Sequence, residues 1–128
     1  KDGLIDVIVS DHLPEDEESK RLPFAQAATG AIGVETLLPL SLEMYHNESL
    51  PLNKIIETLT VNPAKILKIK KGSLAKGSDG DICIFDLEAP WAVQADKLKS
   101  KSKNTAIEGR KLQGKVLMTF LNGELAFS

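Results

Sequence analysis

The stretch Leu4-Ile5-Asp6-Val7-Ile8-Val9, followed directly by Ser10-Asp11-His12-Leu13-Pro14, decides the fold of this chain. Its first part is short, rich in β-branched residues and ended by a turn-forming proline. We therefore predict a buried strand over residues 4–10 with a turn at its carboxyl end. Parallel α/β folds place their chemistry at that end of a strand. Asp11 is a candidate metal ligand or general base, and the alternative is a carboxylate that caps the turn.

Apart from carboxylates, the chain has few residues that commonly bind metals: two histidines and one cysteine. His12 adjoins Asp11, but neighbouring residues at a strand end point to opposite faces, so we expect it to pack or to orient the loop through a hydrogen bond. We expect His46 to interact with a helix end and Cys83 to be a small buried residue. A catalytic zinc site needs at least three protein ligands. The chain is therefore not expected to complete one alone.

Composition sets the class of protein. The chain has 128 residues, 42% of them hydrophobic, and a net charge of −2, which suits one globular domain or part of one and argues against a nucleic-acid or polybasic membrane binder. A single cysteine excludes an internal disulfide and favours a reducing, cytoplasmic setting. No apolar run approaches the roughly 18–20 residues of a membrane span. Because the strand-like run begins close to Lys1 and no Met precedes it, we expect a piece of a longer polypeptide.

The chain divides into a helical half and a β half. Residues 11–33 form a long irregular segment with an acidic cluster at 15–18, and such a segment is usually functional. Apolar spacing predicts helices over 35–46, 51–59 and 63–67, the last with Asn62 as N-cap and with Ile66 and Leu67 facing inward. Strands are predicted over 81–86, 91–93, 112–121 and 124–127, with a type I′ hairpin at Asn122-Gly123.

The tract Thr29-Gly30-Ala31-Ile32-Gly33 precedes the first predicted long helix. It lacks the Gly-Lys-Ser/Thr ending of a phosphate loop. Its small residues would let backbone amides approach a ligand closely, and a tight turn before the helix explains them equally well.

Several motifs occur together in a fixed order, and they cover essentially the whole chain. They are Ser10-Asp11-His12-Leu13-Pro14, Lys20-Arg21-Leu22-Pro23-Phe24, Gly30-Ala31-Ile32-Gly33-Val34-Glu35-Thr36-Leu37-Leu38-Pro39, Thr60-Val61-Asn62-Pro63-Ala64, the tract from Gly72 to Ile82, and Ser102-Lys103-Asn104-Thr105. In this the chain resembles the C-terminal part of the dihydroorotases, cyclic amide hydrolases of the amidohydrolase superfamily. The resemblance implies an α/β fold: the C-terminal end of a (β/α)8 TIM barrel, within residues 1–70, and part of a small β-sandwich module, within residues 71–128.

The resemblance also implies a function, which is the zinc-dependent, reversible hydrolysis of dihydroorotate to N-carbamoyl-aspartate in pyrimidine biosynthesis. Asp11 matches the aspartate of the last barrel strand, which binds zinc and moves the proton of the attacking water. Thr29 and Gly30 match the loop whose backbone meets the substrate. The other zinc ligands would lie upstream in the same protein, so this chain by itself is expected to be inactive. Assembly into a homo-oligomer is left open.

One departure from the family pattern keeps other functions open. Where many dihydroorotases carry a histidine that binds the substrate carboxylate, this chain has Glu15. A carboxylate cannot donate a hydrogen bond unless it is protonated, so either the substrate contact differs or the parent protein is a non-catalytic homologue that scaffolds a partner enzyme. A further alternative is another cyclic amidase, of the hydantoinase or allantoinase type.

Overall fold

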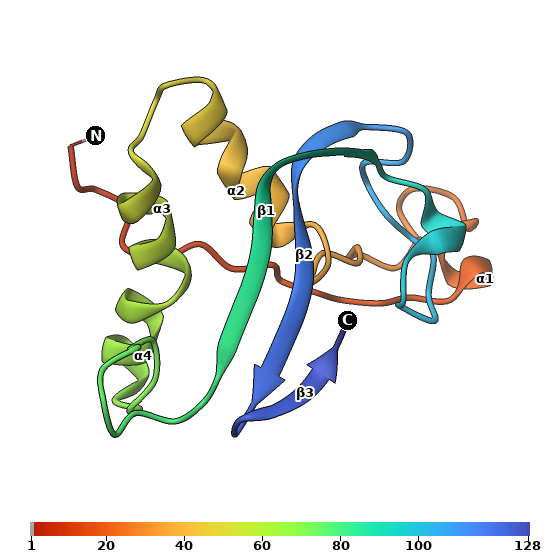
Figure 1. The fold of residues 1–128 in the computed structure, drawn as a ribbon. Helices are drawn as coiled ribbons and strands as arrows, with labels where there is room; N and C mark the ends of the chain where they lie inside the picture. Colours follow the sequence, from red (N-terminus) through yellow and green to blue (C-terminus); the bar gives the residue numbers. More distant parts are fainter. Residues whose placement is uncertain (1) are drawn as a thin grey trace.

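A computed structural model describes residues 2–128. Figure 1 shows an extended N-terminal segment, a group of helices and a small sheet. The helices are α1 (Glu17–Lys20), α2 (Leu37–His46), α3 (Leu52–Leu59) and α4 (Val61–Leu67). The strands are β1 (Ile82–Ala92), β2 (Lys111–Leu121) and β3 (Glu124–Phe127), with a 3-10 turn, η1 (Ala95–Lys97), after β1. The molecule is therefore a small α/β unit in which the helices precede the strands.

The sheet is antiparallel, with the strand order β1-β2-β3. Strand β1 joins most of both predicted strands, 81–86 and 91–93, into a single strand whose pairing with β2 shifts between Asp86 and Pro90. The Asp86 carboxylate accepts hydrogen bonds from the N–H groups of Glu88 and Ala89, at 2.9 and 3.1 Å. At this irregularity two backbone N–H groups thus find an acceptor, and Pro90, which has no N–H to donate, is tolerated. The strand therefore continues past the irregularity.

The predicted hairpin at Asn122-Gly123 is confirmed, and it joins β2 to β3. Asn122 and Gly123 both have positive φ, 51° and 82°, as a type I′ turn requires. The turn is local, and the residues at its two central positions suffice to specify it.

The predicted helices form with shifted starts. Helix α2 begins at Leu37 rather than residue 35, and helix α4 begins at Val61, so Asn62 lies inside the helix and does not cap it. The Asn62 amide instead donates to the backbone carbonyl of Asp6 at 2.8 Å. The prediction that Ile66 and Leu67 face inward is wrong, because they are 65% and 67% exposed. Their neighbour Ala64 takes the buried position in α4.

Residues 4–10, predicted as a strand, are extended but belong to no sheet within this chain. A strand needs a neighbour to satisfy its N–H and C=O groups, and among residues 2–128 none pairs with it. Its described contacts include a hydrogen bond from Ile8 N to Thr58 O at 3.2 Å and, just beyond it, an isolated parallel bridge between His12 and Ala31. Leu4 and Ile5 remain exposed rather than buried.

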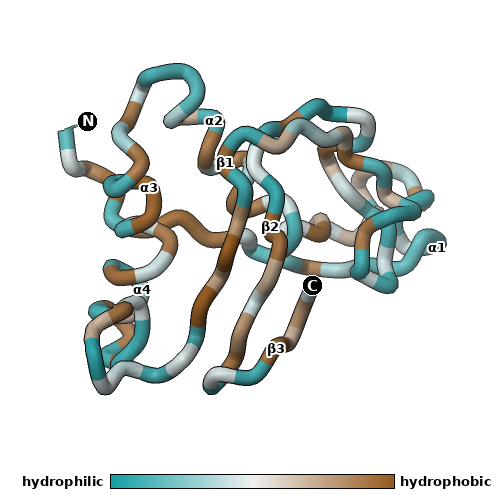
Figure 2. The backbone as a smooth tube through the Cα atoms, in the orientation of Figure 1, coloured by the Kyte–Doolittle hydropathy of each residue, from teal (hydrophilic) through white to brown (hydrophobic). Residues whose placement is uncertain are grey.

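The core joins the two halves of the chain. Its buried residues are Ile32, Val93, Leu98 and Leu112, with Leu40, Trp91 and Ile107 packed against them. Figure 2 shows hydrophobic stretches in the helices and in both long strands. Not every apolar residue is covered: Cys83 is exposed on β1, so the prediction of a buried cysteine is wrong. Its neighbours Ile82 and Ile84 face the opposite side of the strand and are exposed too, so this end of β1 has too little cover on either side to bury Cys83.

Candidate functional site

Asp11 lies where the extended segment turns. Its φ of 44° is in the left-handed region, which aspartate adopts more readily than most residues. Asp11 lines an open cavity of about 520 Å³. Three parts of the chain line this cavity, within residues 8–11, 30–44 and 106–107. Asp11 thus borders a space large enough for a small molecule, with mostly apolar residues around it.

Gly30 lines the same cavity as Asp11, so the structure brings these two predicted site residues together. The φ of Gly30 is +113°, and a Cβ there would lie 2.7 Å from the Leu13 side chain. The other two predicted residues lie outside the cavity lining. Thr29 is exposed beside Gly30, and Glu15 is half-buried four residues after Asp11. The predicted substrate loop therefore reaches the cavity at Gly30, and the next three residues line the cavity as well.

Direct hydrogen bonds hold the segment after Asp11 against the segment that contains Gly30. Leu13 N donates to Ala31 O at 3.0 Å. The Nδ1 atom of His12 accepts from Gly33 N at 3.1 Å, so a neutral His12 carries its proton on Nε2. This contact confirms the prediction that His12 orients the loop through a hydrogen bond. The two segments form one wall, and neither can move without breaking these bonds.

A third segment, which contains Ser102 and Asn104 and precedes β2, contacts both of these segments. The Asn104 side chain accepts from Glu15 N at 3.4 Å and donates to Gly30 O at 3.3 Å. Ser102 Oγ donates to Glu15 O. Sequence reasoning assigned no role to Ser102 or Asn104 beyond the resemblance. Because these contacts span more than 70 residues, no local pattern could have indicated them.

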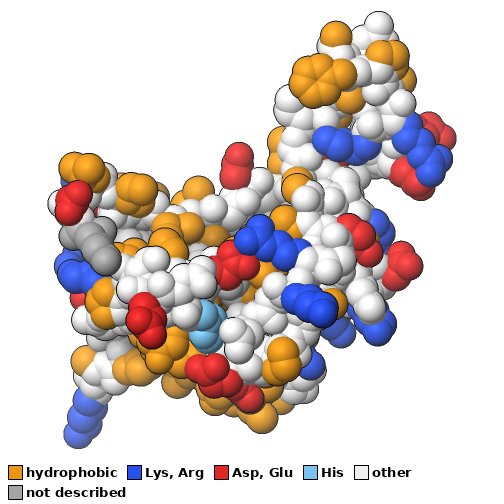
Figure 3. Space-filling view, turned by 90° about the horizontal axis from the view of Figure 1, so that it is seen from above, with side chains coloured by type: hydrophobic (Ala, Val, Ile, Leu, Met, Phe, Trp, Pro, Cys, Tyr) orange, Lys and Arg blue, Asp and Glu red, His pale blue; other side chains and the backbone are white. Residues whose placement is uncertain are grey.

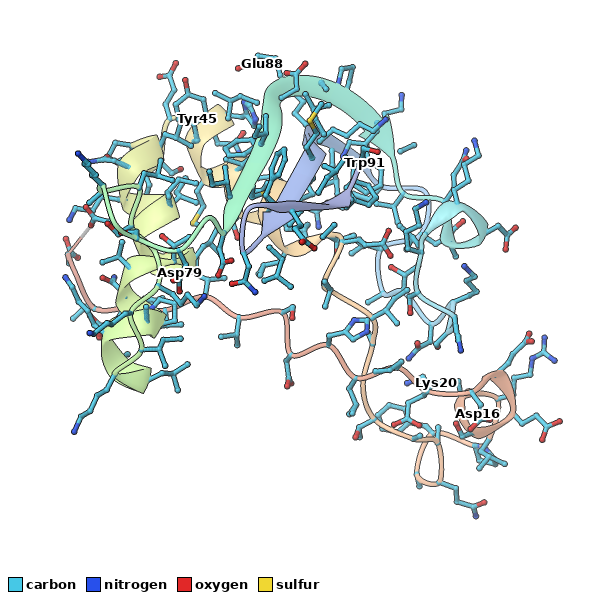
Figure 4. The ribbon with its side chains drawn as sticks, turned by 60° about the horizontal axis from the view of Figure 1, so that its bottom comes forward. Asp16, Lys20, Tyr45, Asp79, Glu88 and Trp91 are labelled. Atoms are coloured by element: carbon cyan, nitrogen blue, oxygen red, sulfur yellow. The ribbon has the colours of Figure 1, made fainter. Side chains whose placement is uncertain are left out.

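Lys20 is another residue that the sequence left without a role. Its ammonium group donates to Ala28 O at 2.7 Å and Gly30 O at 3.0 Å. Figure 4 shows Lys20 and Asp16 on the loop around α1, which projects away from the sheet. Asp16 is the N-cap of α1, and the hydrogen bond from the Ser19 N–H lowers its pKa. Part of the acidic cluster at 15–18 thus lies in α1. The last residue of α1, Lys20, holds the Gly30 loop by its hydrogen bonds.

Charged residues elsewhere do not converge on the cavity. Figure 3 shows acidic and basic side chains interspersed over the face seen from above. His46 lies in the last turn of α2, edge-on to the Tyr45 ring at 5.3 Å between centroids. Within residues 2–128, no group of three or more His, Cys, Asp or Glu side chains could hold a metal ion. The Asp11 carboxylate could supply one zinc ligand, but the described residues do not form a complete zinc site.

The helices are too short or too polar to cross a lipid bilayer in the part of the chain that the structure describes.

Comparison with known proteins gives the family. The profile of the amidohydrolase family matches residues 1–126. The chain is 45% identical over 127 residues to the dihydroorotase of Ehrlichia chaffeensis, covering 99% of this chain and 28% of that protein. It is 40% identical over 126 residues to the dihydroorotase of Geobacter sp., covering 98% of this chain and 30% of that protein. The chain thus spans less than a third of the length of these relatives.

Solved structures agree with the sequence comparison. The L-hydantoinase (dihydropyrimidinase) of Arthrobacter aurescens is 33% identical with a TM-score of 0.87, and the match covers 96% of this chain and 29% of that one. A D-hydantoinase from Bacillus sp. AR9 is 25% identical with a TM-score of 0.90, and the match covers 98% of this chain and 29% of that one. Sequence profile and fold point to the same assignment. The chain belongs to the amidohydrolase family.

Proposed function

We propose that this chain is the C-terminal part of a dihydroorotase, a zinc-dependent enzyme that interconverts dihydroorotate and N-carbamoyl-aspartate in pyrimidine biosynthesis. The observation that carries the proposal is that Asp11 and Gly30 line one open cavity. The identity of 45% to a protein named dihydroorotase supports it. In this proposal the extended residues 4–10 are the last strand of a (β/α)8 barrel. Residues 1–70 belong to that barrel, and residues 71–128 are the C-terminal share of a β-sandwich module.

The proposed roles follow from chemistry at the cavity. Asp11 accepts the proton of the water that attacks the cyclic amide, which is the work of a general base, and it is one ligand of the zinc. Zinc, when bound, makes a water molecule more acidic and polarises a carbonyl. The remaining ligands come from the upstream part of the same protein. Gly30, with Thr29 beside it, offers its backbone to the substrate, and Glu15 stays a weaker candidate because it does not line the cavity.

The test is an assay of the longer protein that includes the residues upstream of Lys1. We expect hydrolysis of dihydroorotate, and Asp11→Asn should lower kcat by about 10²- to 10⁴-fold, as the loss of a general base does. The matched control is Asp6→Asn, an exposed carboxylate on the same extended segment that does not line the cavity. Equal kcat for Asp11→Asn and the wild type would exclude the proposed base. The 128-residue chain alone should show no turnover.

A second candidate is another cyclic amidase of the hydantoinase type, which the structural likeness to an L-hydantoinase at 33% identity favours. Both reactions open a ring amide, so Asp11 would have the same role. A panel of dihydroorotate, hydantoins, dihydrouracil and allantoin separates them, because the preferred substrate has the highest kcat/KM. Turnover of none of these would favour the third candidate, a non-catalytic scaffold, for which Glu15 in place of histidine is the motive. A cytoplasmic location is part of the proposal, and oligomeric state is left to measurement.

A further inference from the structure

The Asn104 side chain connects three segments that are far apart in sequence. Its Oδ1 accepts from Glu15 N at 3.4 Å, and its Nδ2 donates to Gly30 O at 3.3 Å. Its own carbonyl accepts from Ile32 N at 3.3 Å. The side chain is half-buried. Asn104 therefore bonds to the loop after Asp11 on one side and to the loop of Gly30 on the other.

These contacts need a side chain that both accepts and donates. A carboxylate only accepts when ionised, and an alkyl group does neither, whereas a primary amide presents one acceptor oxygen and two donor hydrogens. The Lys20 ammonium also reaches Gly30 O, at 3.0 Å, but a lysine has donors alone and could not bind Glu15 N. The amide of Asn104 is thus matched to its two partners, and its acidic or alkyl replacements are not.

The position of Gly30 matters because it lines the cavity with Asp11. Two bonds already join the segments on one side of Gly30, from Leu13 N to Ala31 O and from Gly33 N to His12 Nδ1. The bond from Asn104 holds Gly30 itself. Without it, the Gly30 carbonyl keeps the flexible Lys20 side chain as its described partner, and the loop gains freedom at the point that faces the cavity.

We propose that Asn104 is a positioning residue that sets substrate affinity by fixing the Gly30 loop relative to the Asp11 loop. This inference rests on the proposed function of the cavity. Asn104 does not line the cavity, so it acts through Gly30 and Glu15. Its loss should weaken substrate binding and leave the proton transfer by Asp11 in place.

The experiment compares Asn104→Asp, Asn104→Ala and the control Asn53→Ala in the longer, zinc-loaded protein. Asn53 is an exposed asparagine on α3. Asn104→Asp keeps the acceptor for Glu15 N and removes the donor to Gly30 O. Losing one hydrogen bond should raise KM for dihydroorotate by roughly three- to tenfold, with kcat within about twofold of wild type, because binding and chemistry are affected separately. Asn104→Ala should raise KM at least as much, and Asn53→Ala should change neither parameter.

Hydrogen–deuterium exchange on the same proteins gives a second readout that needs no substrate. We expect faster exchange at residues 12–16 and 29–33 in both Asn104 variants and unchanged exchange in Asn53→Ala. Unchanged KM and exchange in the Asn104 variants would overturn the inference, as would a fall in kcat with KM unchanged. If Asn104→Ala unfolds, the KM and the exchange rates of Asn104→Asp decide whether the inference holds. If the wild-type protein fails to hydrolyse dihydroorotate, the proposed function fails, and the exchange rates still decide whether Asn104 fixes the two loops.

Discussion

At the scale of single residues, the wall of the cavity depends on a position that suits only glycine. Gly30 has a φ of +113°, and a Cβ there would lie 2.7 Å from the Leu13 side chain. We predict that Gly30→Ala destabilises the protein by about 1–3 kcal/mol, as overpacking does, and raises KM by displacing the loop. Urea denaturation midpoints and steady-state kinetics measure the two effects.

A matched glycine separates the clash from the backbone strain. Gly77 also has a positive φ, +90°, but a Cβ there would meet nothing within 4 Å. Gly77→Ala therefore carries the backbone cost alone, and its KM should equal that of the wild type. If Gly77→Ala and Gly30→Ala lowered stability equally and left KM unchanged, the contact between Gly30 and Leu13 would have no role in shaping the cavity.

At the scale of elements, helix α2 is held on strand β2 by packing more than by charge. Leu42 is fully buried and meets Gly114 of β2. Arg110, just before β2, donates from Nη2 to both carboxylate oxygens of Glu43, at 2.7 and 3.0 Å, but both side chains are partly exposed. We predict that Leu42→Ala costs about 2–5 kcal/mol of unfolding free energy and Glu43→Gln at most about 1 kcal/mol. Urea denaturation compares the two, and a larger loss for Glu43→Gln would reverse this ranking.

The elements that the sequence predicted well are those whose determinants are local. The hairpin at Asn122-Gly123 needs two adjacent residues, and the helix at 52–59 follows from its own apolar spacing. The strand at 4–10 does not form within this chain because a strand forms only beside a partner, and a pattern within six residues cannot supply one. The orientation of Ile66 failed for the same reason, since burial depends on what packs against the helix.

The candidate site divides in the same way. Asp11 is a candidate from the sequence because a strand-like run and a proline turn mark its place. Gly30 is a candidate because it lies in a tract of small residues and because of the family resemblance. Asn104 has no such local marker. Its proposed role follows from contacts with residues 74 and 89 positions away, which form only when the fold brings Asn104 against the loops of Glu15 and Gly30. The candidate chemical residues could thus be proposed from the sequence, whereas Asn104, which we propose positions the Gly30 loop, could not.

At the scale of the whole molecule, one cluster of ion pairs and hydrogen bonds connects the chain after the last helix to the sheet. Lys71, just after α4, contacts Asp79 at 2.8 Å and also Asp81, both before β1. The Asp81 carboxylate accepts from Asn122 N at 2.8 Å, and Gly123 N donates to the carbonyl of the residue before Asp81 at 3.0 Å. A single carboxylate therefore links the chain after the last helix to the turn between the last two strands.

This cluster predicts how stability depends on pH. The Asn122 N–H, and then the Lys71 ammonium, hold the pKa of Asp81 below its ordinary value of 3.8. A lowered folded-state pKa means that the stabilisation is complete above the unfolded pKa and is lost as pH falls through the folded pKa. Asp81→Asn keeps an acceptor for Asn122 and removes the charge, so we expect a weaker loss of stability below about pH 4. Urea midpoints measured from pH 2 to 7 check this, with Asp96→Asn, an exposed carboxylate on η1, as the control. Parallel acid limbs for Asp81→Asn and the wild type would show that the charge of Asp81 does not fasten the two halves.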